Sequence, residues 1–218
     1  MVPPPGPRAC PVDLHAASAA RTSGPSLSRT GLFGVCCTGP LGRGSRLTPR
    51  AHARLSVPVR IVDLTEQYAA DIVTWRYPEP YQHYDLCGAD PAYFLDPANG
   101  FYALVDEDDA LIGYRSFGPD GQVPGGAYDD AALDTGGGLR PELTGQNRGL
   151  GRRAITTGLA FGREQFHPAV FRVTVADFNI RARHVVESLG FLYSSSFAAT
   201  TDGSRFNILL LKNQDHSG

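Results

Sequence analysis

The sequence has few cysteines, and most of them lie near its start. Cys10, Cys36 and Cys37 are three of the four, and only Cys87 follows them. Cys36 and Cys37 are adjacent, so they lack the spacing of a zinc site or of a disulfide framework. We therefore expect no metal site, and the pattern indicates a reducing compartment and a cytoplasmic protein.

Long hydrophobic runs and a basic excess are also absent. In residues 1–54 the only apolar run, 31–35, is far shorter than the roughly 20 residues of a membrane-spanning helix. No signal-peptide pattern precedes this run. The formal net charge of -2 argues against a nucleic-acid partner. We therefore expect neither a membrane nor a nucleic acid among the partners.

The small net charge hides two different parts of the chain. Residues 1–54 carry seven arginines and one aspartate, a net of +6, whereas the remaining 13 basic and 21 acidic residues give -8. The first part is rich in Pro, Ser and Gly, so it cannot bury enough apolar surface to offset its ordering entropy. We predict a disordered tail over 1–54 and one domain over 55–218. An organelle transit peptide or an over-extended translation start would have the same composition.

The domain alternates predicted strands and helices, recognised by apolar periodicity, capping residues and turn residues. In chain order they are a strand at 57–64, helices at 63–75 and 90–95, strands at 101–106, 111–117 and 132–139, a helix ending near 166, a strand at 171–176, a helix at 181–189 and a hairpin of 192–198 with 206–211. Asp63 and Glu66 have the spacing of a capping box for the first helix. Gly136 to Gly138, inside a predicted strand, indicate a bulge, a close backbone approach or a loop.

The stretch from Arg140 to Gly151 is a glycine-containing turn that opens directly into a predicted helix. Free backbone N–H groups at a helix N-terminus, together with the positive end of the helix dipole, bind phosphate oxygens. We therefore predict an anion site at this turn, for the pyrophosphate of a cofactor.

Two motifs resemble those of the GCN5-related N-acetyltransferase (GNAT) superfamily. The loop pattern Gln/Arg-x-x-Gly-x-Gly/Ala is met in full by residues 146–151, Gln-Asn-Arg-Gly-Leu-Gly. The pattern Asn-x-x-Ala-x-x-x-Tyr-x-x-x-Gly-Phe is met at positions 179, 182, 190 and 191, with Val186 in place of the tyrosine. The resemblance extends from about residue 57 to the C-terminus.

This resemblance implies a fold, a co-substrate and an activity. The fold is a mixed α/β (α+β) domain with a mostly antiparallel sheet of six or seven strands flanked by helices. A bulge at residues 136–138 splays its fourth strand from the fifth in a V shape. The activity is N-acetyltransferase, by direct attack of a primary amine on acetyl-CoA in a ternary complex. The residues expected to bind acetyl-CoA are Leu139, Arg140, Gln146, Arg148, Gly149, Leu150, Gly151, Arg152 and Asn179. Asn179 has the alternative of capping the following helix.

The groups that move protons are less evident. Backbone N–H groups over residues 139–142 are the candidates to polarise the thioester carbonyl. Glu142 is the first choice as the catalytic proton acceptor, which near neutral pH is a carboxylate with a raised pKa, a histidine or a water chain. Other available side chains are Glu79, His83 and Asp134. Val186 replaces the family's usual proton donor, so we expect Tyr193 or solvent to protonate the thiolate.

The aromatic stretch 75–84 resembles the substrate-side loop of one branch of the superfamily. Trp75, Tyr81, His83 and Tyr84 are expected to line the acceptor site, although aromatic residues at this density also pack as core. Resemblance to the ribosomal-protein-alanine acetyltransferase-like branch makes the acceptor a protein N-terminal amine or a small-molecule amine. The acidic domain would attract a cationic amine. We expect a monomer or a homodimer.

Two other functions stay open. Residues 149–154 also fit the Gly-x-Gly-x-x-Gly/Ala fingerprint of a dinucleotide-binding oxidoreductase, with Asp177 at the end of the next strand. The polar residues ahead of the glycines and the lack of a second βαβ half argue against it. The other alternative is a non-catalytic acyl-CoA-binding module, because Val186 replaces the tyrosine.

Overall fold

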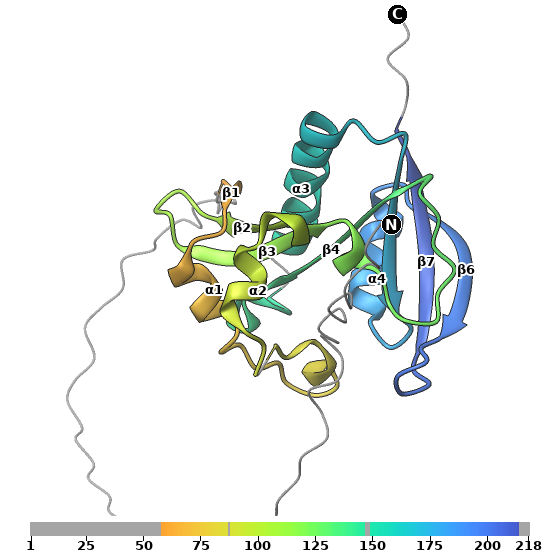
Figure 1. Ribbon diagram of the computed structural model, residues 1–218, viewed down its shortest axis with the longest axis horizontal. Coiled ribbons are helices and arrows are strands. Elements are labelled where there is room, and N and C mark those ends of the chain that lie inside the picture. The colour runs from red at the N-terminus through yellow and green to blue at the C-terminus, as the bar shows by residue number, and fades with distance from the viewer. Residues whose placement is uncertain (1–57, 87, 147–148, 214–218) are drawn as a thin grey trace, which may run out of the picture. The chain divides into compact units, whose positions relative to one another are not determined.

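The structure, a computed structural model, describes residues 58–86, 88–146 and 149–213. The tail predicted over 1–54 lies outside the described residues, so that prediction and the domain boundary at residue 55 stay predictions. Within the described part, one sheet of seven strands is flanked by helices (Figure 1). In these ranges no helix is both long and apolar enough to cross a bilayer.

The elements follow the predicted order. The strands are β1 (Arg60–Asp63), β2 (Phe101–Val105), β3 (Leu111–Phe117), β4 (Leu133–Leu139), β5 (Val170–Ala176), β6 (Leu192–Ala198) and β7 (Arg205–Lys212). The α-helices are α1 (Glu66–Ile72), α2 (Pro91–Leu95), α3 (Leu150–Phe166) and α4 (Ile180–Ser188). This confirms the predicted mixed α/β fold.

Helix α1 does not begin where the sequence predicted. Asp63 is the last residue of β1, where it pairs with Tyr102, so it is not the cap. The cap is Thr65, whose Oγ1 accepts a hydrogen bond from the Tyr68 N–H at 3.2 Å. A short polar side chain just ahead of the first turn satisfies one of the helix's unpaired N–H groups, and Thr65 has this place. The helix also ends earlier than predicted, at Ile72.

The sheet has one parallel junction. Its strands lie in the order β1-β2-β3-β4-β5-β7-β6, and all neighbours are antiparallel except β4 and β5. These two pair only at Leu133 with Phe171 and at Asp134 with Arg172. Beyond these pairs the strands separate (Figure 1), which confirms the predicted V-shaped splay. The mostly antiparallel sheet is not the doubly wound parallel sheet of a dinucleotide-binding oxidoreductase.

The glycines of β4 allow neighbouring groups to lie close to its backbone, and the predicted bulge is absent. The pairing of β4 with β3 keeps one register through all three glycines. Gly137 has a φ of 147°, and a Cβ there would lie 2.4 Å from the carbonyl oxygen of Tyr114. A Cβ on Gly138 would lie 2.9 Å from the Tyr77 hydroxyl oxygen. Backbone and side chains therefore crowd this strand so closely that only glycine fits.

Two clusters of buried side chains hold the helices on opposite faces of the sheet. Phe101 and Tyr102 are consecutive in β2 and belong to different clusters, as expected where side chains alternate between faces. The Phe101 cluster joins α1 and α2 to β2 and β3. The other joins α3 and α4 to β5 and β7 around Phe171, which a Cβ on Gly162 would approach to 2.8 Å. The sheet therefore has helices on both of its faces.

Candidate active site

A cavity of about 480 Å³ lies where β4 and β5 separate. Its wall is formed by residues 135–139 of β4 and 173–175 of β5. The rest of the wall includes parts of β3 and of the segment after it, the loop between α1 and α2, and the first turns of α3 and α4. The cavity is therefore the space that the short β4–β5 pairing leaves.

The N-terminus of α3 forms one end of the cavity. The helix follows Gly149, which has a φ of 70° and gives no side-chain cap. The Arg153 N–H donates to the Gly149 carbonyl at 3.1 Å, so the N–H groups of the three residues between them have no partner within the helix. A Cβ on Gly149 would meet no described atom within 4 Å, and one on Gly151 only a Leu139 methyl at 3.9 Å. This open turn fits the phosphate groups of a nucleotide cofactor.

One edge of β4 presents its backbone to the cavity. The Arg140 N–H donates to the Ile112 carbonyl oxygen of β3 at 2.9 Å. Since antiparallel partners alternate between bonded and non-bonded pairs, the N–H and C=O of Leu139 face away from β3. The Leu139 carbonyl accepts a hydrogen bond from the Tyr77 hydroxyl at 2.8 Å. Of the donors predicted over residues 139–142, Arg140 is used in the sheet and Pro141 has no N–H, whereas the Leu139 N–H lies on the edge of β4 that faces away from β3.

The side chains of Arg140 and Trp75 lie together, away from the cavity. Trp75 is 4% exposed and belongs to the core under α1 and α2. Its indole N–H donates to Asp71 at 3.2 Å, and the Arg140 guanidinium bonds the same carboxylate. The guanidinium carbon lies 5.3 Å from the indole ring centre. Neither residue is among those that line the cavity, and their predicted binding roles stay predictions.

Other predicted cofactor-binding residues do line the cavity. Gln146, Leu150 and Arg152 are among its lining residues, together with the two glycines of the turn. Arg152 donates to the Ser188 hydroxyl at 2.6 Å, which holds its guanidinium between α3 and the end of α4. Arg148 lies outside the described residues, so its predicted role stays a prediction.

Asn179 caps α4 and also bonds a second side chain. Its Oδ1 accepts the Ala182 N–H at 3.1 Å, as expected of an N-cap. Its Nδ2 donates to the Tyr84 hydroxyl at 3.0 Å. Because Asn179 lines the cavity, its side chain fixes the position of Tyr84 on the cavity wall.

Tyr81, His83 and Tyr84 line the cavity from a 3-10 turn, Tyr81–Tyr84, in the α1–α2 loop. The rings of Tyr81 and Tyr84 each lie 5.9 Å from that of Phe178. Burial raises the pKa of Tyr84, so its hydroxyl keeps its proton at neutral pH. Since its oxygen accepts a bond from Asn179, the O–H stays a donor.

His83 connects this turn to the β6–β7 hairpin. Its Nε2 lies 2.9 Å from Asp202 Oδ2 and 3.1 Å from Ser204 Oγ. The turn that carries the aromatic residues is thereby fixed to a distant part of the chain. His83 thus helps to position this wall of the cavity.

The two predicted catalytic side chains lie outside the cavity. Glu142 is exposed in the 3-10 turn Pro141–Leu143, and Tyr193 is 56% exposed on β6. Neither is among the lining residues. Asp134, another acid considered from the sequence, is 3% exposed and forms an ion pair with Arg172.

Two other titratable residues line the cavity, and no sequence motif indicated them. Asp120 follows β3, and its carboxylate accepts a hydrogen bond from Tyr93 at 2.8 Å. Burial raises the pKa of this carboxyl. Tyr114 of β3 has its pKa raised to about 12, first by burial and then by Tyr84 and Asp120. Tyr84, Tyr114 and Asp120 therefore all line the cavity.

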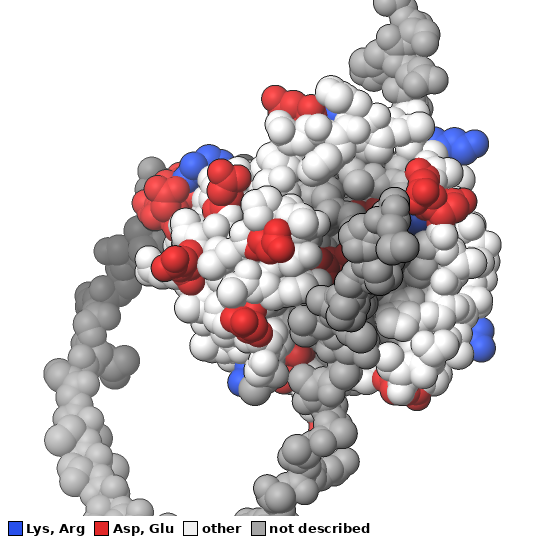
Figure 2. Space-filling view, in the orientation of Figure 1, with Lys and Arg blue, Asp and Glu red and all other residues white. Residues whose placement is uncertain are grey.

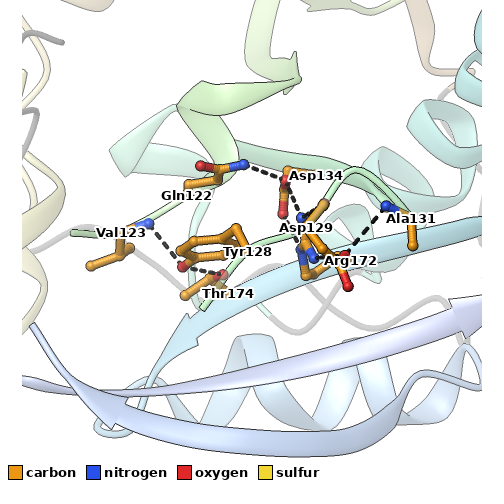
Figure 3. Close-up of polar contacts among 8 residues, drawn as sticks. All are labelled: Gln122, Val123, Tyr128, Asp129, Ala131, Asp134, Arg172 and Thr174. Carbon is orange, nitrogen blue, oxygen red and sulfur yellow. Dashed lines mark hydrogen bonds and ion pairs between the residues drawn. The ribbon is translucent and has the colours of Figure 1, made fainter. Parts of the chain in front are cut away.

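At the closed end of the splay, polar side chains join β4 to β5 (Figure 3). Arg172 donates from Nε to Asp134 Oδ1 at 2.6 Å and from Nη2 to Oδ2 at 2.8 Å, a bidentate pair. Its Nη1 donates to Asp129 at 2.8 Å, and Gln122 donates to Asp134 at 2.8 Å. The guanidinium carbon lies 4.9 Å from the Tyr128 ring centre. The charge of Arg172 is thus paired with two carboxylates, and these bonds raise its pKa.

Arg115 of β3 lies close to this network and has few partners. Its side chain is buried, and Nη2 donates to Thr135 Oγ1 at 2.7 Å. Its Nε is buried without a hydrogen-bond partner. Burial lowers the pKa of Arg115 to about 10, so it is charged at neutral pH. It lines the cavity, which therefore contains a cation that the sequence motifs did not indicate.

Acidic side chains are conspicuous on the surface near this site. Figure 2 shows them over the part of the molecule formed by α1, α2 and the β2–β3 turn, with basic side chains mainly toward the rim of this view. The β2–β3 turn alone has four acidic residues in a row, 106–109. The visible face thus carries a negative field.

Fold and cavity together define a domain in which a helix N-terminus without a side-chain cap lies beside two splayed strands. The sequence matches the acetyltransferase (GNAT) family over residues 63–191, more than half of the 218 residues. The chain belongs to the acetyltransferase (GNAT) family. No curated protein sequence matches it.

Solved acetyltransferase structures share this fold. The structure of yncA from Salmonella typhimurium with its cofactor acetyl-CoA has 18% identity and a TM-score of 0.51, covering 73% of this chain and 96% of that chain. The ribosomal-protein-S5-alanine acetyltransferase from Vibrio fischeri has 14% identity and a TM-score of 0.50, covering 72% and 94%. AAC(6')-Ib in complex with ribostamycin and coenzyme A has 14% identity and a TM-score of 0.56, covering 72% and 94%.

Proposed function

We propose that the protein transfers an acetyl group from acetyl-CoA to a primary amine. The observation that carries this proposal is the open N-terminus of α3 at one end of a cavity between two splayed strands. The yncA structure contains acetyl-CoA and the AAC(6')-Ib structure contains coenzyme A, which supports the same cofactor here. When bound, acetyl-CoA would supply the acyl group as an activated thioester.

The open turn and the edge of β4 would hold this co-substrate. The N–H groups of Leu150, Gly151 and Arg152 would bind its phosphates, and the Arg152 guanidinium would add a charge-assisted bond. The Leu139 N–H would donate to the thioester oxygen as negative charge develops there. These roles need only groups that line the cavity.

Two cavity side chains are suited to proton transfer. Asp120 has a raised carboxyl pKa, which makes it a better base for the proton of an amine. Tyr84 keeps its proton and has its O–H available for the leaving sulfur. We therefore assign to Asp120 and Tyr84 the roles that the sequence predicted for Glu142 and Tyr193.

The acceptor is a primary amine, either a small molecule or a protein N-terminus. The acidic surface near α1 and α2 would attract a cationic amine. The ribosomal-protein-S5-alanine acetyltransferase and AAC(6')-Ib are equally distant in sequence, at 14% identity each. The ribosomal-protein-alanine branch therefore stays one candidate among several.

Thermal unfolding of the full chain tests the co-substrate. A ligand at 100 times its Kd adds about 2.7 kcal/mol to the free energy of unfolding, which raises the Tm by roughly 5 to 10 °C. We expect this shift with acetyl-CoA and none with NADH. A transfer assay over a panel of amines then tests turnover. A chain that acetyl-CoA does not stabilise would contradict the proposal.

Kinetics of Asp120→Asn test the proton acceptor. Because its pKa is raised, Asp120 takes up its own proton at a higher pH than an ordinary carboxyl, and kcat/KM should fall below that pH. The variant should lower kcat/KM by about 10²- to 10⁴-fold and remove this acidic limb. Asp130→Asn, at an exposed residue, is the matched control. A variant with wild-type rate and pH profile would remove Asp120 from the role.

A further inference from the structure

Arg115 brings an uncompensated positive charge into the cavity. Its side chain is 6% exposed, and Nε has no hydrogen-bond partner. Only a neutral hydroxyl, that of Thr135, accepts from Nη2. Among the described residues no carboxylate forms a salt bridge with Arg115. Burying a cation destabilises the folded state unless the cation is paired with an anion. We therefore expect an anion from outside the chain to pair with Arg115.

The acidic and phenolic neighbours of Arg115 do not supply that anion. Tyr114 has a pKa of about 12 and is neutral at physiological pH. Asp120 lines the same cavity, but its carboxylate forms no ion pair with Arg115 among the described residues. Asp134 is held by the bidentate bond from Arg172. Nε is buried against Gly158 of α3, so the donors that the guanidinium keeps for a ligand are those of Nη1 and the second N–H of Nη2.

The surrounding backbone is shaped around this guanidinium. A Cβ on Gly158 of α3 would lie 2.8 Å from Arg115 Nε. A Cβ on Gly137 of β4 would lie 3.1 Å from Nη1. Two glycines from two different elements thus leave the space that the side chain occupies. Together with the bond to Thr135, they fix the guanidinium at the wall of the cavity.

This cation is separate from the phosphate turn. Gly158, which Arg115 contacts, lies seven residues beyond Gly151 in α3, or about 10 Å along the helix at 1.5 Å per residue. Phosphates bound at the first turn would not reach it. The anion at Arg115 therefore belongs to a different part of the reactants.

We infer that Arg115 binds a carboxylate carried by one of the two substrates, either at the end of the donor's acyl chain or on the acceptor amine. A guanidinium fork matches a carboxylate with two parallel hydrogen bonds, which neutral acyl groups and simple amines do not offer. The inference rests on the proposed function, because the cavity that receives the carboxylate is the one proposed for acyl transfer. Arg115 is then a specificity-determining residue.

Binding of matched ligand pairs to the full chain tests this inference. Calorimetric titration compares propionyl-CoA with succinyl-CoA and, in the presence of coenzyme A, tyramine with tyrosine. Each pair differs by a carboxylate. In one pair the carboxylate-bearing member should bind about ten- to hundredfold more tightly, as expected for hydrogen bonds to a charged group. The pair that shows the preference identifies which substrate carries the carboxylate.

Variants of Arg115 show whether the preference comes from this residue. Arg115→Met and Arg115→Gln should both abolish it, and Arg115→Lys should restore part of it. The control is Arg163→Met, which removes one positive charge at the edge of a different cavity. The Tm of each variant without ligand shows that it is folded.

Two results would overturn the inference: no carboxylate preference in either pair, or a preference that survives in both Arg115→Met and Arg115→Gln. Failure of the proposed function gives a different result, since acetyl-CoA would then neither bind nor raise the Tm. A carboxylate preference that depends on Arg115 would uphold the anion site in either case.

Discussion

Arg172 and Arg115 are two buried arginines of one sheet with opposite surroundings. Arg172 donates to Asp134 and Asp129 at distances of 2.6 to 2.8 Å (Figure 3). Arg115 has one hydroxyl acceptor at 2.7 Å and an unpaired Nε. The first charge is neutralised within the chain, whereas the second is not. Arg172 thus stabilises the fold, whereas Arg115 is the arginine that we propose to bind a ligand.

The positions of the two residues explain the difference. Arg172 pairs with Asp134 where β4 and β5 are still joined, so its bonds hold the closed end of the splay. Arg115 lines the cavity that opens beyond this point. The paired charge of Arg172 lies where β4 and β5 separate, and the unpaired charge of Arg115 faces the cavity beyond that point. Changes to one should therefore affect stability, and changes to the other should affect binding.

Removing Arg172 should have the largest effect on stability. Arg172→Met leaves Asp134, with its side chain 4% exposed, as a buried carboxylate without its ionic partner. Breaking a buried pair in this way costs about 3 to 5 kcal/mol. Denaturant unfolding measures the loss. The control is Arg183→Met, whose pair with Glu187 is exposed and screened by solvent and should contribute little to stability. Equal losses in the two variants would contradict the role of Arg172.

Filling the space beside Arg115 should have the next largest effect. Gly158→Ala places a Cβ 2.8 Å from Arg115 Nε, and overpacking of this kind costs about 1 to 3 kcal/mol. The matched control is Gly151→Ala in the same helix, where the nearest atom would be 3.9 Å away. That change should stabilise by up to about 1 kcal/mol, because alanine favours helix over glycine. Thermal unfolding of both variants distinguishes the cases, and a stabilising Gly158→Ala would contradict the close contact.

Removing Arg115 itself should cost no stability. Arg115→Met takes away a buried charge that no carboxylate pairs, so the free energy of unfolding should stay unchanged or rise by about 1 to 2 kcal/mol. This is the opposite sign to Arg172→Met. Parallel denaturant curves for the two variants make the comparison. A loss as large as that of Arg172→Met would show that Arg115 is paired within the fold.

A modest loss of stability is expected at Thr135. Its hydroxyl accepts from Arg115 and donates to the Ser116 carbonyl at 3.0 Å. Thr135→Val keeps the shape and removes both hydrogen bonds, at a cost of about 1 kcal/mol. Thr156→Val, at an exposed residue of α3, is the control for the substitution itself. No difference between the two would mean that Thr135 does not hold the guanidinium.

Much of the fold could be predicted from the sequence. Apolar periodicity and turn residues are local signals, and β4, β5 and α3 lie where the pattern indicated. The glycine turn was predictable because only a short run of residues is needed to form it. The cap of α1 was mispredicted because Asp63 is used in the sheet, and pairing between distant segments leaves no local signal.

The side chains of the site were harder to predict. Glu142 and Arg140 are close in sequence to the phosphate turn, yet neither lines the cavity. Proximity along the chain does not determine which way a side chain points at the end of a strand. Arg115 and Asp120 follow no motif, because their burial depends on how β3, β4 and α3 pack together. Such residues are identified only from the three-dimensional arrangement.

Calorimetric titration of acetyl-CoA into the wild-type chain and into Gly151→Glu shows whether the turn ahead of α3 binds the cofactor. The substitution puts a carboxylate at the open turn, where a Cβ meets only a methyl group at 3.9 Å, so the fold should be unaffected. We predict binding to the wild type, a loss of binding in the variant and an unchanged Tm without ligand. A wild type that does not bind, or a folded variant that binds equally well, would contradict the assignment of this turn to the cofactor.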